Sequence, residues 1–193
     1  AALSEEVANR LGVALPAITE LRVFRRSCDA RKAAAPTFIY SVDVALLDEA
    51  TVLERHAGDR HVQPTPDMHY HFVGRAPLPL TTRPIVVGFG PAGIFAALVL
   101  AQSGFRPIVV ERGKAVRERT QDTWGLWRKR ILDPESNVQF GEGGAGTFSD
   151  GKLYSQIKDP RHYGRKVLSE FVRAGAPEEI LYVSKPHIGT FRL

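Results

Sequence analysis

A glycine motif within the apolar segment 85–101 constrains the fold of this chain more than any other feature. The segment reads IVVGFGPAGIFAALVLA and contains the spacing G-x-G-x-x-G. The three glycines are Gly88, Gly90 and Gly93. Strand-type residues precede the motif, and a helix-forming run with proline at its first position follows it. This order predicts a strand over 84–87, a tight turn, and a helix over 91–102.

Each position of the motif has a physical reason in a dinucleotide-binding turn. Gly88 permits the tight turn, Gly90 lets a pyrophosphate approach the backbone, and Gly93 allows the helix to pack closely on the strand. The helix N-terminus offers N–H groups and a partial positive charge to phosphates. The alternatives are a glycine turn without a nucleotide and a membrane span, although the glycines and the proline argue against a span.

A carboxylate follows the second expected strand. That strand covers 107–110 and is followed by Glu111, 18 residues after Gly93. Such a carboxylate can accept hydrogen bonds from ribose hydroxyls and would repel a 2′-phosphate. The pattern therefore favours FAD or NAD over NADP.

A second glycine-rich stretch covers 141–152 and reads GEGGAGTFSDGK. Its glycines can turn several backbone N–H groups towards an anion. It is not a P-loop, because Leu153 stands where the magnesium-binding hydroxyl would be needed. A flexible loop without a ligand is the alternative reading of this stretch.

The N-terminal part predicts a small α+β unit over 1–74, followed by a proline-containing linker over 75–83. The C-terminal part, 84–193, reads as a Rossmann-like α/β domain, and the family resemblance given below implies that it is the N-terminal portion of an FAD-binding domain. The elements expected in the first unit are helices over 4–11 and 48–56 and strands over 18–26, 36–47 and 68–73.

Composition places the chain among folded globular proteins, with 44% hydrophobic and 24% charged residues. The one cysteine, Cys28, cannot form an internal disulfide, so the cytosol is the expected compartment. On a strand, Cys28 is expected in the core. His69 and His71 are expected as a surface pair rather than a metal site, because no further ligands accompany them.

Charge is unevenly distributed along the chain. Residues 83–193 contain 17 Lys/Arg against 11 Asp/Glu, whereas residues 1–82 contain 9 against 10. Seven of the cations lie in 112–130, together with Trp124 and Trp127. This segment predicts a helix with a solvated basic face and inward tryptophans. The alternative is nucleic-acid binding, in which cations neutralise phosphates and aromatics stack on bases.

Together these motifs resemble a bacterial family of FAD-dependent dehydrogenases, usually described as uncharacterised NAD(P)/FAD-dependent oxidoreductases. The resemblance covers nearly the whole chain. Its marks are RRSCDARK at 25–32, VGFGPAG at 87–93, ERGK at 111–114, FGEGGAGTFSDGKL at 140–153 and KPHIGT at 185–190. It implies a two-dinucleotide-binding-type flavoprotein, of which this chain would be a fragment lacking further strands.

The resemblance and the motifs together give one set of expected cofactor contacts. The turn and Glu111 would hold the FAD pyrophosphate and ribose, and the second glycine stretch would lie beside the pyrophosphate or flavin, with its N–H groups as candidate donors to the flavin. The residues in this set are Gly88, Gly90, Pro91, Ala92, Gly93, Glu111, Arg112, Gly143, Gly144, Ala145, Gly146 and Thr147.

The sequence therefore predicts a cytoplasmic FAD-dependent oxidoreductase without a membrane partner, with NAD(P)H as a possible electron donor bound outside this chain. Lys152 and His187 are the polar residues to test for a role in catalysis. Two alternatives remain: a flavin-dependent tRNA- or RNA-binding protein using 112–130, and a non-catalytic nucleotide-binding module.

Overall fold

The computed structural model describes residues 2–31, 36–189 and 191–192, and it is an α/β structure with small sheets. Lys32 and Thr190, which belong to the family-like motifs, lie outside the described residues. The chain divides into two compact units. The first comprises 1–68 with 178–186, and the second comprises 69–177 with 187–193.

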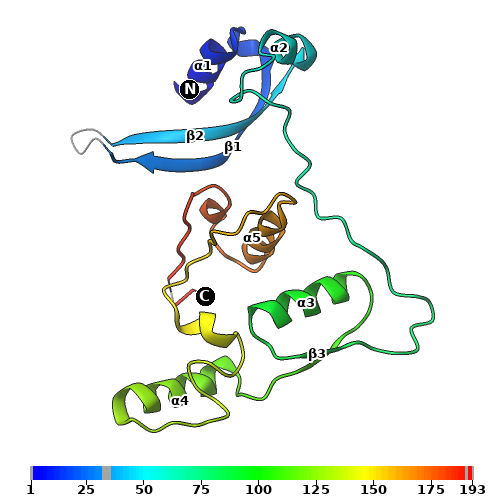
Figure 1. Ribbon diagram of the computed structural model, residues 1–193, viewed down its shortest axis with the longest axis vertical. Coiled ribbons are helices and arrows are strands. Elements are labelled where there is room, and N and C mark those ends of the chain that lie inside the picture. The colour runs from blue at the N-terminus through cyan, green and yellow to red at the C-terminus, as the bar shows by residue number, and fades with distance from the viewer. Residues whose placement is uncertain (1, 32–35, 190, 193) are drawn as a thin grey trace. The chain divides into compact units, whose positions relative to one another are not determined.

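The first unit is a long antiparallel hairpin with two short helices (Figure 1). Its register pairs Leu21 with Val44 and Cys28 with Phe38. Its main elements are α1 (Ala2–Leu11), β1 (Ile18–Asp29), β2 (Thr37–Leu46) and α2 (Glu49–Arg55). The expected helices and first two strands are therefore confirmed, with β1 running three residues further than expected.

A small apolar core joins the two helices of this unit. Ala8 and Leu11 of α1 are buried with Val52 of α2. Asp48 begins α2 by accepting a hydrogen bond from the N–H of Thr51 at 3.1 Å, which satisfies one of the free donors of the first turn. Apolar burial therefore stabilises both helices, and the side-chain cap stabilises the start of α2.

The segment 178–186 belongs to this first unit, although the sequence suggested that it would follow the C-terminal domain. The N–H of Arg26 donates to the carbonyl of Tyr182 at 2.7 Å, and the N–H of Ser184 donates to the carbonyl of Arg26 at 2.9 Å. The Arg26 guanidinium also lies over the rings of Phe38 and Tyr182, 5.7 and 5.3 Å from their centroids. These contacts extend the hairpin by a parallel bridge.

The second unit contains the predicted strand, turn, helix and strand. Two three-residue strands pair in parallel, Ile85 beside Ile108 and Val87 beside Val110. Helix α3 connects them along the chain, and Figure 1 shows this helix next to β3. The named helices and strands here are β3 (Ile85–Val87), α3 (Pro91–Gln102), β4 (Ile108–Val110), α4 (Val116–Lys129) and α5 (Tyr163–Arg173). Two strands do not by themselves define a Rossmann domain, so that finer assignment belongs to the proposal below.

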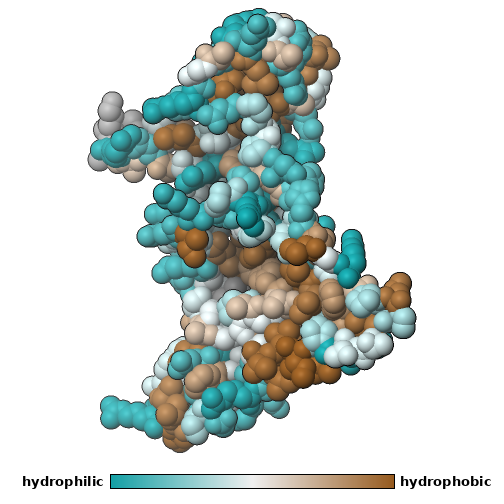
Figure 2. Space-filling model, turned by 45° about the vertical axis from the view of Figure 1, so that its right-hand side comes forward, coloured by the Kyte–Doolittle hydropathy of each residue, from teal (hydrophilic) through white to brown (hydrophobic). Residues whose placement is uncertain are grey.

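The apolar residues of this small sheet are largely exposed. The exposed fractions of Ile85, Val87 and Val110 are 64%, 85% and 51%, and Figure 2 shows broad hydrophobic areas on the molecular surface. By contrast, the buried side chains described in this unit are polar. They are Ser103, Arg119, Thr123, Ser136 and Asn137. Hydrogen bonds join three of them, Arg119, Ser136 and Asn137, to α4 or to the segment that follows it.

The expected strand over 68–73 was wrong, because this segment has no strand pairing. Its alternation is nevertheless real: the rings of Tyr70 and Phe72 lie 5.1 Å apart, and Tyr70 lies 5.8 Å from the ring of Tyr163 on α5. The ammonium of Lys166 lies about equally close to both rings, 5.6 and 5.5 Å from their centroids. A helix, not a strand, is the partner of this aromatic face.

Three further expectations concern single side chains and the membrane. Cys28 is exposed, so its expected core position was wrong, because a two-stranded hairpin leaves much of its surface uncovered. His69 and His71 are exposed, and the described residues contain no cluster that could ligate a metal. Across the described ranges, none of the helices combines the length and apolar character needed to cross a membrane.

Candidate functional site

A pocket of about 350 Å³ lies where the glycine turn meets the ends of β3 and β4. This volume is at the lower end of the range for small-molecule sites. All of its walls come from the second unit. The lining residues are Val87, Gly88, Gly90, Val110, Glu111, Arg112, Gln139, Phe140, Gly141 and Gly144.

The turn has the geometry that its glycines allow. Gly88 adopts φ +93°, which disfavours other residues, and its N–H donates to the carbonyl of Val110 at 2.7 Å. A Cβ added to Gly93 would lie 2.0 Å from the Gly88 carbonyl oxygen, so the helix touches the turn directly. Gly90 precedes α3 and, lacking a side chain, leaves the N–H groups of the first helical turn, including that of Ala92, without a side-chain cap.

The second glycine stretch packs against this turn. The N–H of Gly143 donates to the carbonyl of Phe89 at 2.8 Å. A Cβ on Gly144 would lie 2.9 Å from the Cα of Gly90 and 3.1 Å from the Cδ of Pro91. The two backbones can approach this closely because Gly90 and Gly144 carry no side chains. A wall of bare backbone results, which is the kind of surface that a diphosphate can approach.

Glu111 lies half-buried at the pocket and is held by backbone donors. Its carboxylate accepts the N–H of Phe89 at 2.6 Å and that of Gly113 at 2.9 Å. Burial acts to raise the pKa of Glu111, but hydrogen bonds from Gly113, Phe89, Gly141 and Arg112 outweigh it, so the pKa lies below its usual value. The carboxylate is therefore ionised at neutral pH and fixed in orientation.

The other expected contacts are distributed around this wall. Arg112 makes two hydrogen bonds with Glu135, at 2.6 and 3.0 Å, and lies over the Phe140 ring, 4.3 Å from its centroid. Ala145 is exposed, and a Cβ on Gly146 would lie 3.8 Å from the Cγ of Pro91. These residues flank the pocket.

The N–H donors expected from 143–147 are partly used by the fold. The N–H of Gly143 is bonded to Phe89, and the N–H of Gly144 donates to the carbonyl of Gly141 at 2.9 Å. Thr147 directs its hydroxyl inward to the carbonyl of Glu142 at 3.3 Å. Because the two glycine donors hold the segment together, their expected role as donors to the flavin is not supported by this geometry.

Sequence reasoning missed Arg119, which is fully buried behind this wall. Its guanidinium donates to the carbonyls of Asn137, Val138 and Glu142 and to the hydroxyl of Thr147, at 2.6–3.2 Å. An arginine in a basic helix is expected at the surface. The local sequence holds no signal for burial, because the acceptors lie about 20 residues further along the chain.

The basic segment is less available to an anionic polymer than its composition suggested. Lys114 contacts Asp122 and Asp133, at 2.8 and 3.3 Å. With Arg112 paired to Glu135 and Arg119 buried, three of the seven cations face carboxylates or the interior. The expectation of inward tryptophans was also wrong: Trp124 is 43% exposed beneath the Arg128 guanidinium, and Trp127 is 57% exposed beside the ring of Phe148.

Lys152 and His187 lie together, but they do not line the pocket. The two residues form an antiparallel bridge, and each places its side chain 3.7–3.8 Å from a carboxylate oxygen of Asp150. The ring of Tyr154 lies 5.5 Å from that of His187. This cluster is a separate, half-exposed group of polar side chains.

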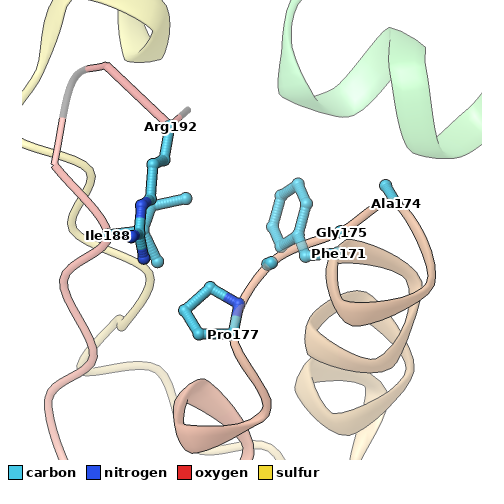
Figure 3. Close-up of a pocket in the computed structure, with 7 residues that line it drawn as sticks. Phe171, Ala174, Gly175, Pro177, Ile188 and Arg192 are labelled. Carbon is cyan, nitrogen blue, oxygen red and sulfur yellow. The ribbon is translucent and has the colours of Figure 1, made fainter.

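A second, larger cavity of about 530 Å³ opens between the end of α5 and the residues Ile188 and Arg192 (Figure 3). Phe171, Pro177 and Ile188 give it an apolar wall, and Arg192 is its charged residue. It contains neither glycine motif nor a carboxylate. We therefore place the candidate site at the smaller pocket, where backbone donors and an ionised carboxylate converge.

Comparison with known proteins gives two matches. A family model described as a domain of unknown function (DUF8436) matches residues 1–45. A protein of Clostridium beijerinckii, named as an uncharacterized protein, is 44% identical over 188 residues. The aligned region covers 97% of this chain and 35% of that protein. The chain thus spans about a third of the length of this relative.

Proposed function

We propose that this chain is the FAD-binding portion of a flavin-dependent oxidoreductase, related to the FAD-dependent dehydrogenases that its motifs resemble. The observation that carries the proposal is the meeting of two glycine segments, about 50 residues apart in sequence, at the ends of two parallel strands. Open α/β sheets bind nucleotides at this edge. The proposal includes completion of this small sheet as a doubly wound, Rossmann-like domain.

The pocket residues suit the diphosphate and ribose of a dinucleotide. First-turn N–H groups of α3, at Ala92 and Gly93, would bind the phosphates, and the bare backbone at Gly90 and Gly144 would allow their close approach. Glu111 is ionised, which fits ribose hydroxyls and disfavours a 2′-phosphate. Ribose hydroxyls would share the Glu111 oxygens with the backbone donors that now occupy them.

Bound FAD would supply hydride-transfer chemistry, while the protein residues bind and orient it. The described pocket contains Glu111 and Arg112 as its charged side chains and no pair suited to acid–base catalysis. For this reason a non-catalytic nucleotide-binding module is the second candidate. In the oxidoreductase proposal, NAD(P)H is the electron donor, and its site is formed by polypeptide beyond the residues described.

A single methyl group tests the proposal. Gly90 has φ −78° and ψ −175°, which alanine adopts without strain, and an added Cβ would lie 3.7 Å from Gly144, an ordinary contact. Gly90→Ala should therefore fold normally yet occupy the space that a diphosphate needs. Gly74→Ala is the matched control, because its Cβ would have nothing within 4 Å.

The measurement is FAD uptake by equilibrium dialysis, followed by the visible spectrum of the protein and of the flavin released by heat. We expect bound FAD in the wild type and in Gly74→Ala, and at least a ten-fold weaker affinity in Gly90→Ala. Equal FAD affinity in all three proteins would contradict the assigned site. A folded wild-type chain that takes up no FAD would contradict the function.

A further inference from the structure

Arg119 is a buried cation whose direct hydrogen-bond partners are neutral. Its side chain has no exposed surface, and it contacts three backbone carbonyls, the Thr147 hydroxyl and the face of Phe148, whose ring centroid lies 4.9 Å from the guanidinium. Among the residues that the structure describes, its direct contacts include no carboxylate, so burial lowers the pKa of Arg119, and the charge of Glu111 opposes this only in part. Burying a charge is costly unless hydrogen bonds or a nearby counter-charge offset it.

The contacts of Arg119 are concentrated on the segment that forms the pocket wall. All four acceptors lie in 137–147, downstream of α4. A Cβ on Gly141 would lie 2.5 Å from the Cδ of Arg119, so the backbone passes directly over the arginine side chain. Arg119 therefore holds the backbone of 137–147 in its observed conformation.

A continuous hydrogen-bond chain links Arg119 to the glycine turn. Arg119 Nη1 donates to the carbonyl of Glu142 at 2.6 Å, and the N–H of the same peptide group, that of Gly143, donates to the carbonyl of Phe89 at 2.8 Å. Phe89 lies between Gly88 and Gly90. A charge at one end polarises such a chain and strengthens each bond in it.

From this geometry we infer that Arg119 is a positioning residue for a diphosphate: it holds the 141–147 segment against the Gly88–Gly93 turn and supplies a buried positive charge one layer behind the pocket wall. The ligand class is a nucleoside diphosphate or a molecule containing one. The inference rests on the proposed function, since FAD contains such a group, but it makes a separate claim about which residue forms the site.

The test compares ADP, which carries the diphosphate, with adenosine, which lacks it, by titration calorimetry. Arg119→Met removes the charge and the donors while keeping an extended side chain. We expect this variant to bind ADP at least ten-fold more weakly than the wild type and adenosine unchanged. Arg119→Lys, which keeps the charge and loses the planar donor set, should restore part of the ADP affinity.

Arg128→Met is the matched control, because Arg128 lies on the same helix with its guanidinium 3.6 Å from the centroid of the exposed Trp124 ring. It should bind both ligands as the wild type does. If Arg119→Met binds ADP within two-fold of the wild type, or loses ADP and adenosine equally, the inference is overturned.

If Arg119→Met fails to fold, Thr147→Val tests the same role of Arg119. This change keeps the shape and removes only the hydroxyl that Arg119 contacts at 3.2 Å. It should weaken ADP binding by about three- to ten-fold without affecting adenosine, and unchanged ADP binding would overturn the inference. A wild type that binds neither ADP nor FAD would refute the proposed function and this inference together, whereas normal ADP binding by Arg119→Met would refute the inference alone.

Discussion

Gly93→Ala is the substitution for which the structure gives the clearest energetic prediction. The added Cβ would lie 2.0 Å from the Gly88 carbonyl oxygen and 2.9 Å from its carbon, whereas real Cβ contacts stay above 3.0 Å. The turn or the helix must therefore shift by about 1 Å, and overpacking of this kind costs about 1–3 kcal/mol. Alanine recovers up to about 1 kcal/mol of helix propensity. We expect a net destabilisation of about 1–2 kcal/mol.

Urea unfolding followed by tryptophan fluorescence reports on the second structural unit, which contains Gly93, because both tryptophans, Trp124 and Trp127, lie on α4 of that unit. With a slope of about 2 kcal/mol per molar urea, the midpoint should fall by about 0.5–1 M. Gly90→Ala provides the contrast. Its backbone suits alanine, so it should be as stable as the wild type or more stable by up to about 1 kcal/mol.

The two alanine variants differ only in which glycine gains a methyl group, so their order of stability is the test. If Gly93→Ala is as stable as Gly90→Ala, the close packing of α3 on the carbonyl of Gly88 is refuted. Gly74→Ala, with open space around its Cβ, serves as the reference for the generic effect of losing a glycine.

Three further predictions concern charged and polar residues. The pKa of Glu111 is lowered on folding, so its contribution to stability is present above the usual pKa of about 4.3 and is lost as the pH falls through the folded value. In urea titrations at decreasing pH, the free energy of unfolding should therefore fall less for Glu111→Gln than for the wild type. Parallel pH profiles of the two proteins would contradict this. Replacing the three cations at 128–130 with glutamine should leave the FAD content unchanged, because none of them lines the pocket. A loss of FAD would contradict this. A steeply salt-dependent affinity of the wild type for tRNA would favour the RNA-binding alternative. His187→Asn should also retain FAD, since His187 belongs to the separate cluster with Asp150, and flavin content measured after heat release checks this.

Local features of the second unit could be predicted from sequence because their causes are local. The glycine spacing, the proline at the first helical position and the apolar strands determine the strand–turn–helix–strand around Gly88 and Gly93. The alternation of residue types at 68–73 could not show whether this segment pairs as a strand or packs its aromatic rings on α5, because alternate residues are covered in both cases. The placement of 178–186 and the burial of Arg119 depend on contacts between distant segments, for which the sequence holds no periodic signal.

Whether the two glycine segments form one site for a diphosphate is tested most directly by an ADP titration of ¹⁵N-labelled protein, followed by amide NMR. We expect saturable shifts of the Ala92 and Gly93 amides together with those of 141–147, with one affinity for both groups. The Gly90→Ala protein should need at least ten-fold more ADP to reach the same shifts. Shifts confined to one segment, shifts around the cavity at Phe171 and Ile188, or no shifts in a folded protein would contradict the account.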